Sequence, residues 1–187
     1  MKKTALVVLA LASALAFSAC ATANSTDKNS LDAVPAIDVP RYMGKWYEIA
    51  RLPNRFQNMC ASNVSATYAQ KADGKLSVIN TCKKSDGTMT SVEGEARQAS
   101  GSQTNSKLLV RFAPAWLSWL PVVWGDYWII DLAPDYSYAV IGEPRREYLW
   151  LLSRTPKMGA AAYEKFLAGA AAKGFDVSKV EKTIHSE

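Results

Sequence analysis

The sequence is poor in the residues on which most enzyme mechanisms depend. Its 187 residues include a single histidine, His185, in the tail, and only three cysteines. No pair of carboxylates with a catalytic spacing is visible, and no cysteine is left as a nucleophile once the three are assigned below. A suitably placed histidine is also missing as an axial ligand for a tetrapyrrole. We therefore expect no enzyme activity, no metal site and no cofactor.

Clusters of positive charge are absent as well. The formal net charge of the whole chain is +5, and the lysines and arginines are spread along it. Loss of Lys2 and Lys3 with an export signal would lower this charge by two, to +3. Binding to nucleic acid needs a basic patch, so we expect no nucleic-acid partner. A mild positive balance suits a neighbourhood of anionic lipid.

The N-terminal apolar run is too short to cross a bilayer. It covers residues 4–17, whereas a spanning helix needs roughly 20 apolar residues. Two lysines precede it, which is typical of an export signal peptide, here residues 1–19. The small residues immediately before Cys20 resemble the end of a bacterial lipoprotein signal, which implies that cleavage leaves Cys20 lipidated. Ordinary secretory cleavage, with Cys20 removed or left free, is the alternative.

The chain after the signal divides into a tether and a domain. Residues 20–36 are mostly small and polar and are predicted to form a flexible tether. Residues 37–187 are enough for one domain with a real core. Ala21 follows the cysteine, and within the lipoprotein resemblance this favours the outer membrane over the inner one.

Cys60 and Cys82 are the two cysteines of this domain. In an exported protein their default state is a disulfide. They lie 22 positions apart, and closing such a loop stabilises a fold by about 3 kcal/mol in the chain-entropy model. The Cys-x-x-Cys spacing of a reactive thiol pair is missing, so we predict a structural bridge.

Turn signals divide the domain into eight short apolar segments. Glycine, proline and aspartate punctuate them, as in Ala72-Asp-Gly74 and Ser85-Asp-Gly87. This spacing predicts an all-β sandwich or barrel. We place the strands at 45–52, 61–70, 75–83, 90–98, 106–113, 126–132, 136–142 and 147–154.

An alanine-rich segment follows the last strand. Residues 158–173 carry apolar side chains at helical spacing and are predicted to pack on the outside of the sheet. A helix lying on a membrane is the alternative, but the segment has few cations. The tail from Phe175 to Thr183 is expected to add one more edge strand.

The apolar residues of nearly every strand stand at even-numbered positions. Val64, Ala66 and Tyr68 alternate with polar residues, for example, and period-2 alternation marks one buried face. Cys60 and Cys82 share this parity, as a bridge between neighbouring strands requires. The segments near 126–132 and 147–152 are apolar on both faces, so another element must cover them.

Four motifs together resemble the lipocalin family. They are Met43-Gly-Lys-Trp-Tyr-Glu-Ile-Ala-Arg51, Ser65-Ala-Thr-Tyr68, Tyr148-Leu-Trp-Leu-Leu-Ser-Arg-Thr-Pro156 and Gly174-Phe-Asp-Val177. The set is most similar to the bacterial outer-membrane lipoproteins of that family, relatives of apolipoprotein D. The resemblance covers about residues 38–183. It implies an eight-stranded antiparallel up-and-down barrel, with the C-terminal α-helix packed outside and room for one small apolar ligand.

The resemblance also implies a closed end and a ligand cavity. Gly44 and Trp46 begin the first strand and Arg154 ends the eighth, so the guanidinium can stack on the indole and stabilise the closed end by about 1 kcal/mol. The even-numbered residues would line the cavity, although each is also compatible with a simple core role: Val64, Ala66, Tyr68, Val78, Asn80, Val92, Ala96, Leu108, Val110, Phe112, Trp128, Ile130, Tyr138, Val140 and Trp150. Small residues at 66, 94 and 96 leave volume there.

The connector Ala113–Gly125 is unusual because it contains Trp116, Trp119 and Trp124. Loops normally lie on the wet surface, and strand order puts this one at the open end of a barrel. We consider three roles for it: a lid over the cavity, a self-association surface in a homodimer, or a contact with the bilayer interface, where tryptophan is favoured.

The resemblance implies a non-catalytic lipid-binding protein that stores or transports fatty acids or lysophospholipids. It would be lipid-anchored at the outer membrane of a Gram-negative bacterium and face the periplasm. An interaction or dimerisation module built on the tryptophan loop is one alternative, and a lipocalin-type enzyme is another. Glu48 shares the parity of Trp46, but we expect it to stabilise a turn or lie on the surface.

Overall fold

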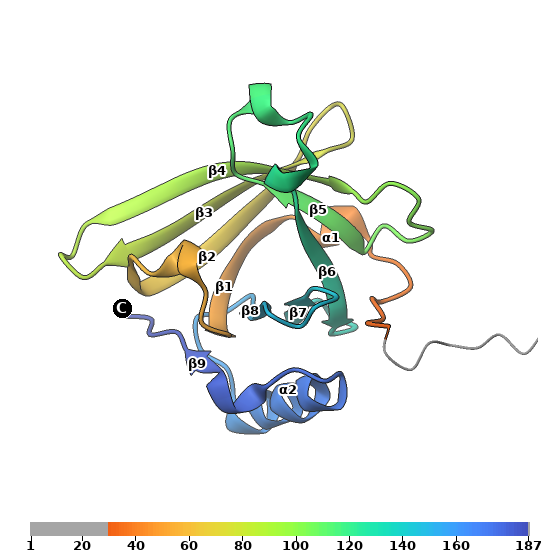
Figure 1. Cartoon of the computed structure of the whole chain (residues 1–187). Coiled ribbons are helices and arrows are strands. Elements are labelled where there is room, and N and C mark those ends of the chain that lie inside the picture. The colour runs from red at the N-terminus through yellow and green to blue at the C-terminus, as the bar shows by residue number, and fades with distance from the viewer. Residues whose placement is uncertain (1–29, 187) are drawn as a thin grey trace, which may run out of the picture.

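The computed structural model describes residues 30–186, which form one antiparallel sheet closed into a barrel (Figure 1). The strand order is β2-β3-β4-β5-β6-β7-β8-β1-β9, and a further pairing of β1 with β2 closes the barrel. The expected eight-stranded up-and-down barrel is therefore confirmed. The strands are β1 (Gly44–Arg51), β2 (Cys60–Gln70), β3 (Leu76–Lys84), β4 (Met89–Gln98), β5 (Lys107–Arg111), β6 (Gly125–Leu132), β7 (Tyr138–Gly142), β8 (Leu149–Ser153) and the short β9 (Glu181–Lys182).

Tight turns join β2 to β3 and β3 to β4 where the sequence predicts them. Gly74 and Gly87 have φ angles of 79° and 84°, a left-handed conformation that glycine adopts without steric cost. In the first turn the carboxylate of Asp73 accepts a hydrogen bond from the backbone N–H of Lys75 at 3.1 Å. Such local bonds fix the reversal, and the predicted strand ends agree with the observed ones within two residues.

The connections alternate between the two ends of the barrel. Those from β2 to β3, β4 to β5 and β6 to β7 lie at the closed end, where the short α1 (Val39–Tyr42) contributes Tyr42 to the buried core. The other connections lie at the opposite, open end. They carry the 3₁₀ helices η1 (Arg55–Gln57), η2 (Ala115–Leu117) and η3 (Pro121–Val123).

Helix α2 (Ala160–Ala172) lies outside the barrel, beside β7 and β8 (Figure 1). Its buried residues Tyr163, Phe166 and Ala170 join Leu149 and Leu151 of β8 in one apolar cluster, the outer core. The predicted packing of this helix is confirmed. It explains why the neighbouring strands are apolar on both faces.

The C-terminal tail closes the seam between β1 and β2. After η4 (Val177–Lys179), β9 pairs with the end of β1, as expected for an edge strand. Beyond it, the carbonyl of Ile184 accepts a hydrogen bond from the N–H of Asn63 at 2.8 Å. The direct pairing of β1 with β2 ends at Tyr47 and Ser65, so the tail bridges the two strands where they separate.

The predicted tether extends too far into the chain. Leu31 is 4% exposed and belongs to the outer core, and the N–H of Val34 donates to the carbonyl of Ile129 at 2.8 Å. Two apolar side chains within a polar stretch thus dock it on the barrel, and residues 31–36 belong to the folded domain.

The predicted signal peptide and Cys20 lie outside the described residues. No helix within residues 30–186 has the length and apolarity needed to cross a membrane.

Candidate functional site: the barrel interior

The even-numbered residues face the barrel interior on β1 as far as Glu48, on β2 to β5 and on β8, whereas Ala50, beyond a bulge in β1, lies in the outer core. Residues directly opposite each other in a ladder share a face. Ala66 stands opposite Trp46 on one side and Asn80 on the other, and Asn80 stands opposite Val92. Trp46 and Ala66 belong to the buried inner core. The structure places these predicted residues on the inner wall: Val64, Ala66, Tyr68, Val78, Asn80, Val92, Ala96, Leu108, Val110, Phe112 and Trp150.

Four predicted cavity residues lie on the outer face instead. Ile130 and Val140 are buried in the outer core with the side chains of α2, and Trp128 and Tyr138 pack against that cluster. The prediction that these four residues line the cavity is wrong. These side chains hold the helix and do not line the interior.

The reason is a change of register between β5 and β6. Leu108 stands opposite Tyr127, so the inward face passes from even-numbered to odd-numbered positions. It returns to even numbers on β8, where Ile141 faces Trp150. Residue parity cannot reveal this shift, because the length and shape of the connection set the register. The inward residues missed for this reason are Tyr127, Ile129, Ala139 and Ile141.

Trp46 and Arg154 meet at the closed end. The indole is fully buried, and its N–H donates to the carbonyl of Tyr42 at 2.8 Å. The guanidinium carbon of Arg154 lies 3.7 Å from the indole ring centroid. Its terminal nitrogens donate to the carbonyls of Lys45 at 3.0 Å and Arg41 at 2.6 Å. These contacts join the start of β1 to the end of β8 and indicate a structural role.

Gly44 allows this arrangement. Its φ of 90° is unfavourable for residues with a side chain. A Cβ atom at this position would lie 3.6 Å from Nη1 of Arg154, so the backbone conformation and not space requires glycine.

Three tyrosine hydroxyls meet inside the barrel and form what we call the tyrosine cluster. The hydroxyl of Tyr127 is hydrogen-bonded to those of Tyr42 at 2.9 Å and Tyr68 at 2.8 Å. Burial raises the pKa of Tyr68 to about 12 and the pKa values of Tyr42 and Tyr127 well above their usual range. All three hydroxyls are therefore neutral near pH 7, and they form a small polar group within an apolar interior.

The inner wall becomes accessible toward the open end. Val92 is 46% and Phe112 38% exposed, although both face inward. The ring of Phe112 occupies the space beside Gly94, where an added Cβ would come within 2.6 Å of it. The volume that the sequence leaves at Gly94 is thus taken by an aromatic side chain. An apolar wall with few polar groups is the usual make-up of a small-molecule site.

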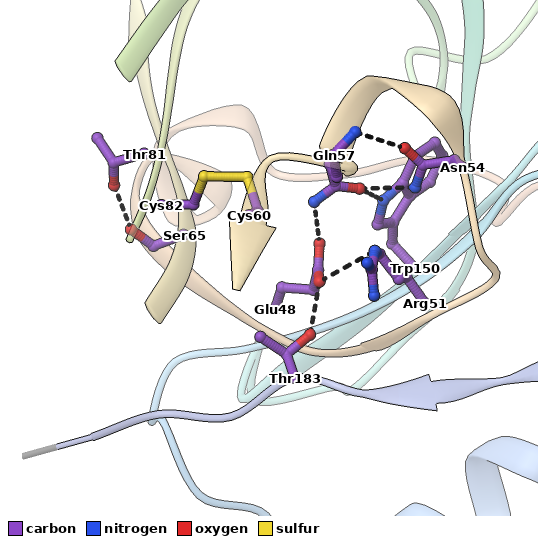
Figure 2. The surroundings of a disulfide bond; sticks show 10 residues. All are labelled: Glu48, Arg51, Asn54, Gln57, Cys60, Ser65, Thr81, Cys82, Trp150 and Thr183. Atoms are coloured by element: carbon purple, nitrogen blue, oxygen red, sulfur yellow. Dashed lines mark hydrogen bonds and ion pairs between the residues drawn. A yellow bond between two sulfur atoms is a disulfide. The ribbon is translucent and has the colours of Figure 1, made fainter. Parts of the chain in front are cut away.

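A polar network lies at the open end, where Glu48 is only 2% exposed (Figure 2). Its carboxylate accepts hydrogen bonds from the amide of Gln57 at 2.6 Å and the hydroxyl of Thr183 at 2.5 Å. The Gln57 amide oxygen accepts from the indole N–H of Trp150 at 2.9 Å. Burial raises the pKa of Glu48, against the opposing effect of these hydrogen bonds and of Arg51. The expectation of a turn or surface role was wrong, and the parity shared with Trp46 was the signal.

The predicted disulfide between Cys60 and Cys82 is confirmed (Figure 2). It joins β2 to β3 near the open end, with Cα atoms 5.5 Å apart. Beside it, a cleft of about 190 Å³ opens where β1 and β2 separate. Glu48, Arg51 and Val64 line this cleft together with tail residues 181–184.

The tryptophan loop, residues 113–124, projects from the barrel between β5 and β6 (Figure 1). Trp124 anchors it: the indole N–H donates to the carbonyl of Ser118 at 2.8 Å, and the guanidinium of Arg97 lies 4.2 Å from the ring centroid. Trp116 and Trp119 are 74% and 75% exposed. A lid would bury these two indoles over the cavity, which is not the arrangement seen. A membrane contact and a dimer surface both need them exposed.

Eight-stranded up-and-down barrels with one closed end are typical of proteins that hold a small molecule. Residues 30–186 bring together no group of histidine, cysteine or acidic side chains that could hold a metal ion. The family model of the lipocalin-like domain matches residues 37–185. The chain belongs to the lipocalin family.

Relatives at moderate identity come from different kingdoms. Temperature-induced lipocalin-1 of Arabidopsis thaliana is 41% identical, over 87% of this chain and 87% of that protein. The outer membrane lipoprotein Blc of Escherichia coli is 37% identical, over 93% and 94%. Apolipoprotein D of Rattus norvegicus is 36% identical, over 64% and 61%.

Solved structures share the fold. Insecticyanin from the tobacco hornworm Manduca sexta superimposes with a TM-score of 0.64 at 24% identity, covering 84% of this chain and 85% of that one. Lobster apocrustacyanin A1 gives 0.61 at 20% identity, covering 79% of each chain.

Proposed function

We propose that this lipocalin binds a fatty acid or lysophospholipid inside its barrel and stores or transports it without catalysis. The observation that supports this proposal most is the inward-facing apolar wall near the open end, where Val92 and Phe112 are partly exposed. This part of the wall suits an acyl chain. The open end gives a headgroup access to water.

We place this function at the outer membrane, on its periplasmic side. Two features support the location: the lipoprotein-like sequence around Cys20, and similarity over nearly the whole chain to proteins named outer membrane lipoproteins. An acyl anchor on Cys20 would keep the barrel close to the lipids that it carries.

Filling the mouth of the barrel is expected to abolish lipid binding. Val92→Trp puts an indole on the inner wall where the parent side chain is 46% exposed, so there is room for it without repacking the core. We expect the affinity for palmitate, measured by isothermal titration calorimetry, to fall at least about tenfold because the indole takes the place of the acyl chain.

Ile79→Trp is the matched control. Ile79 lies on neighbouring β3, points outward and is 42% exposed. The added indole there is expected to leave palmitate affinity within about twofold of the parent. Equal affinities for the two variants would place the binding site outside the barrel.

The tryptophan loop supports a second function, contact with the membrane. Trp116, Trp119 and Val122 are exposed apolar side chains within this one loop, and tryptophan is favoured at the bilayer interface. A homodimer through the same surface is the competing use.

Replacing both Trp116 and Trp119 with serine is expected to weaken vesicle association at least about tenfold in a sedimentation assay. Ile79→Ser, which removes an exposed apolar side chain on the barrel wall, serves as the control. Unchanged vesicle association and unchanged palmitate binding in the double variant would contradict a role for the loop in either process. A parent dimer that the double variant converts to monomer would assign the surface to self-association.

A further inference from the structure

We infer that the interior favours an acyl chain carrying a hydroxyl or carbonyl oxygen near its buried end, held by Asn80 and the tyrosine cluster. This inference rests on the proposed lipid-binding function and specifies its ligand. The polar groups that carry it face the interior from an otherwise apolar wall: the tyrosine cluster is buried, and Asn80 is half-buried in the layer next to it.

The tyrosine cluster has one more proton than it has hydrogen bonds. Three hydroxyls supply three donors, and the two bonds centred on Tyr127 use two of them. The remaining O–H makes no further hydrogen bond within residues 30–186. A neutral hydroxyl in this position is a donor that seeks an oxygen acceptor.

Asn80 supplies the second polar group. It stands opposite Ala66 and Val92 on the inner face of β3, and its amide makes no hydrogen bond within the described residues. Val78, which faces Tyr68, precedes it by two positions on the same face. Successive inward residues lie about 7 Å apart along a strand. The Asn80 amide and the tyrosine cluster therefore occupy adjacent layers of the wall.

The chemistry of these groups selects a neutral oxygen. An amide and a phenol can donate to and accept from a hydroxyl, or donate to a carbonyl. A carboxylate at this depth would need a cation, and the nearby guanidinium of Arg154 is stacked on Trp46 and bonded to two backbone carbonyls. The carboxylate or phosphate headgroup is thus expected at the open end, with the second oxygen on the buried part of the chain.

Two isomeric ligands test this selection. We would titrate the protein with palmitate, 2-hydroxypalmitate and 16-hydroxypalmitate; the last two have the same composition but carry the hydroxyl at opposite ends. One net hydrogen bond corresponds to a factor of about five in affinity. We expect 16-hydroxypalmitate to bind about fivefold more tightly than 2-hydroxypalmitate.

Two variants assign the effect to the named groups. Asn80→Leu and the triple variant Tyr42→Phe/Tyr68→Phe/Tyr127→Phe, which removes every hydroxyl of the cluster, are expected to bring the affinity ratio of the two isomers close to one while leaving palmitate affinity within about twofold. Tyr138→Phe removes a hydroxyl from the outer face and is expected to keep the ratio. If the triple variant folds poorly, Asn80→Leu decides alone, because the amide of Asn80 has no hydrogen-bond partner within the described residues to lose.

The outcomes separate this inference from the proposed function. Equal binding of the two isomers by the parent, with palmitate bound, overturns the oxygen preference and leaves the lipid-binding function standing. A preference that survives in Asn80→Leu and in a folded triple variant overturns the assignment to these groups. Failure of all three acids and of a palmitoyl lysophospholipid to bind overturns both.

Discussion

Replacing Trp46 with alanine is expected to lower the free energy of unfolding by about 4 kcal/mol. The indole is fully buried, donates a hydrogen bond to Tyr42 and lies beneath the Arg154 guanidinium at 3.7 Å. Its loss opens a cavity in the inner core and leaves the cation without the aromatic face, which is worth about 1 kcal/mol. We expect the apparent melting temperature to fall by about 10 °C for a domain of this size.

Urea unfolding followed by circular dichroism measures this change. Trp119→Ala is the matched control, because that indole is 75% exposed, and we expect a change of less than about 0.5 kcal/mol. A Trp46→Ala protein as stable as the parent would contradict the closing role of the Trp46–Arg154 pair.

Removing the disulfide has the next largest expected effect. The bridge closes a loop of 22 residues in sequence separation, and the chain-entropy model assigns about 3 kcal/mol to such a constraint. We expect the double variant Cys60→Ser/Cys82→Ser to lose this amount in urea unfolding. Cys82 is 3% exposed, so a buried serine hydroxyl adds a further cost.

Reduction of the parent separates the two contributions. The parent unfolded in a strong reductant lacks the bridge but keeps both sulfur atoms in the core, and we expect it to be slightly more stable than the serine variant. Equal unfolding free energies of oxidised parent, reduced parent and double variant would show that the bridge does not stabilise the fold.

The strands and the disulfide were predictable because local signals specify them. Asp73-Gly74 and Asp86-Gly87 determine turns through backbone conformation and short-range hydrogen bonds. The shared parity of Cys60 and Cys82 fits the long β2–β3 hairpin that the bridge spans. Such features need no knowledge of distant parts of the chain.

The interior was only partly predictable because it depends on register between strands. The shift between β5 and β6 moves Ile130 and Val140 to the outer core and brings Tyr127 into the cavity. The tryptophan loop forms that connection, and its two 3₁₀ helices have no simple sequence pattern. The tyrosine cluster was missed for this reason.

Glu48 shows a different limit of prediction from sequence. Its parity indicates an inward side chain, but its burial depends on Gln57 in η1 and on Thr183, which is 135 positions away. A charged residue is rarely buried without such partners, so the surface was the reasonable expectation. Only the path of the C-terminal tail brings the hydroxyl to the carboxylate.

Native mass spectrometry of the protein purified without denaturation tests the central claim most directly. The lipid-carrier account predicts a monomer whose native mass exceeds the mass of the same protein after denaturation by one fatty acid or one lysophospholipid, and this increment should disappear in Val92→Trp and persist in Ile79→Trp. A ligand-free dimer would support the interaction module instead. A ligand-free monomer that also fails to take up added palmitate would contradict lipid binding.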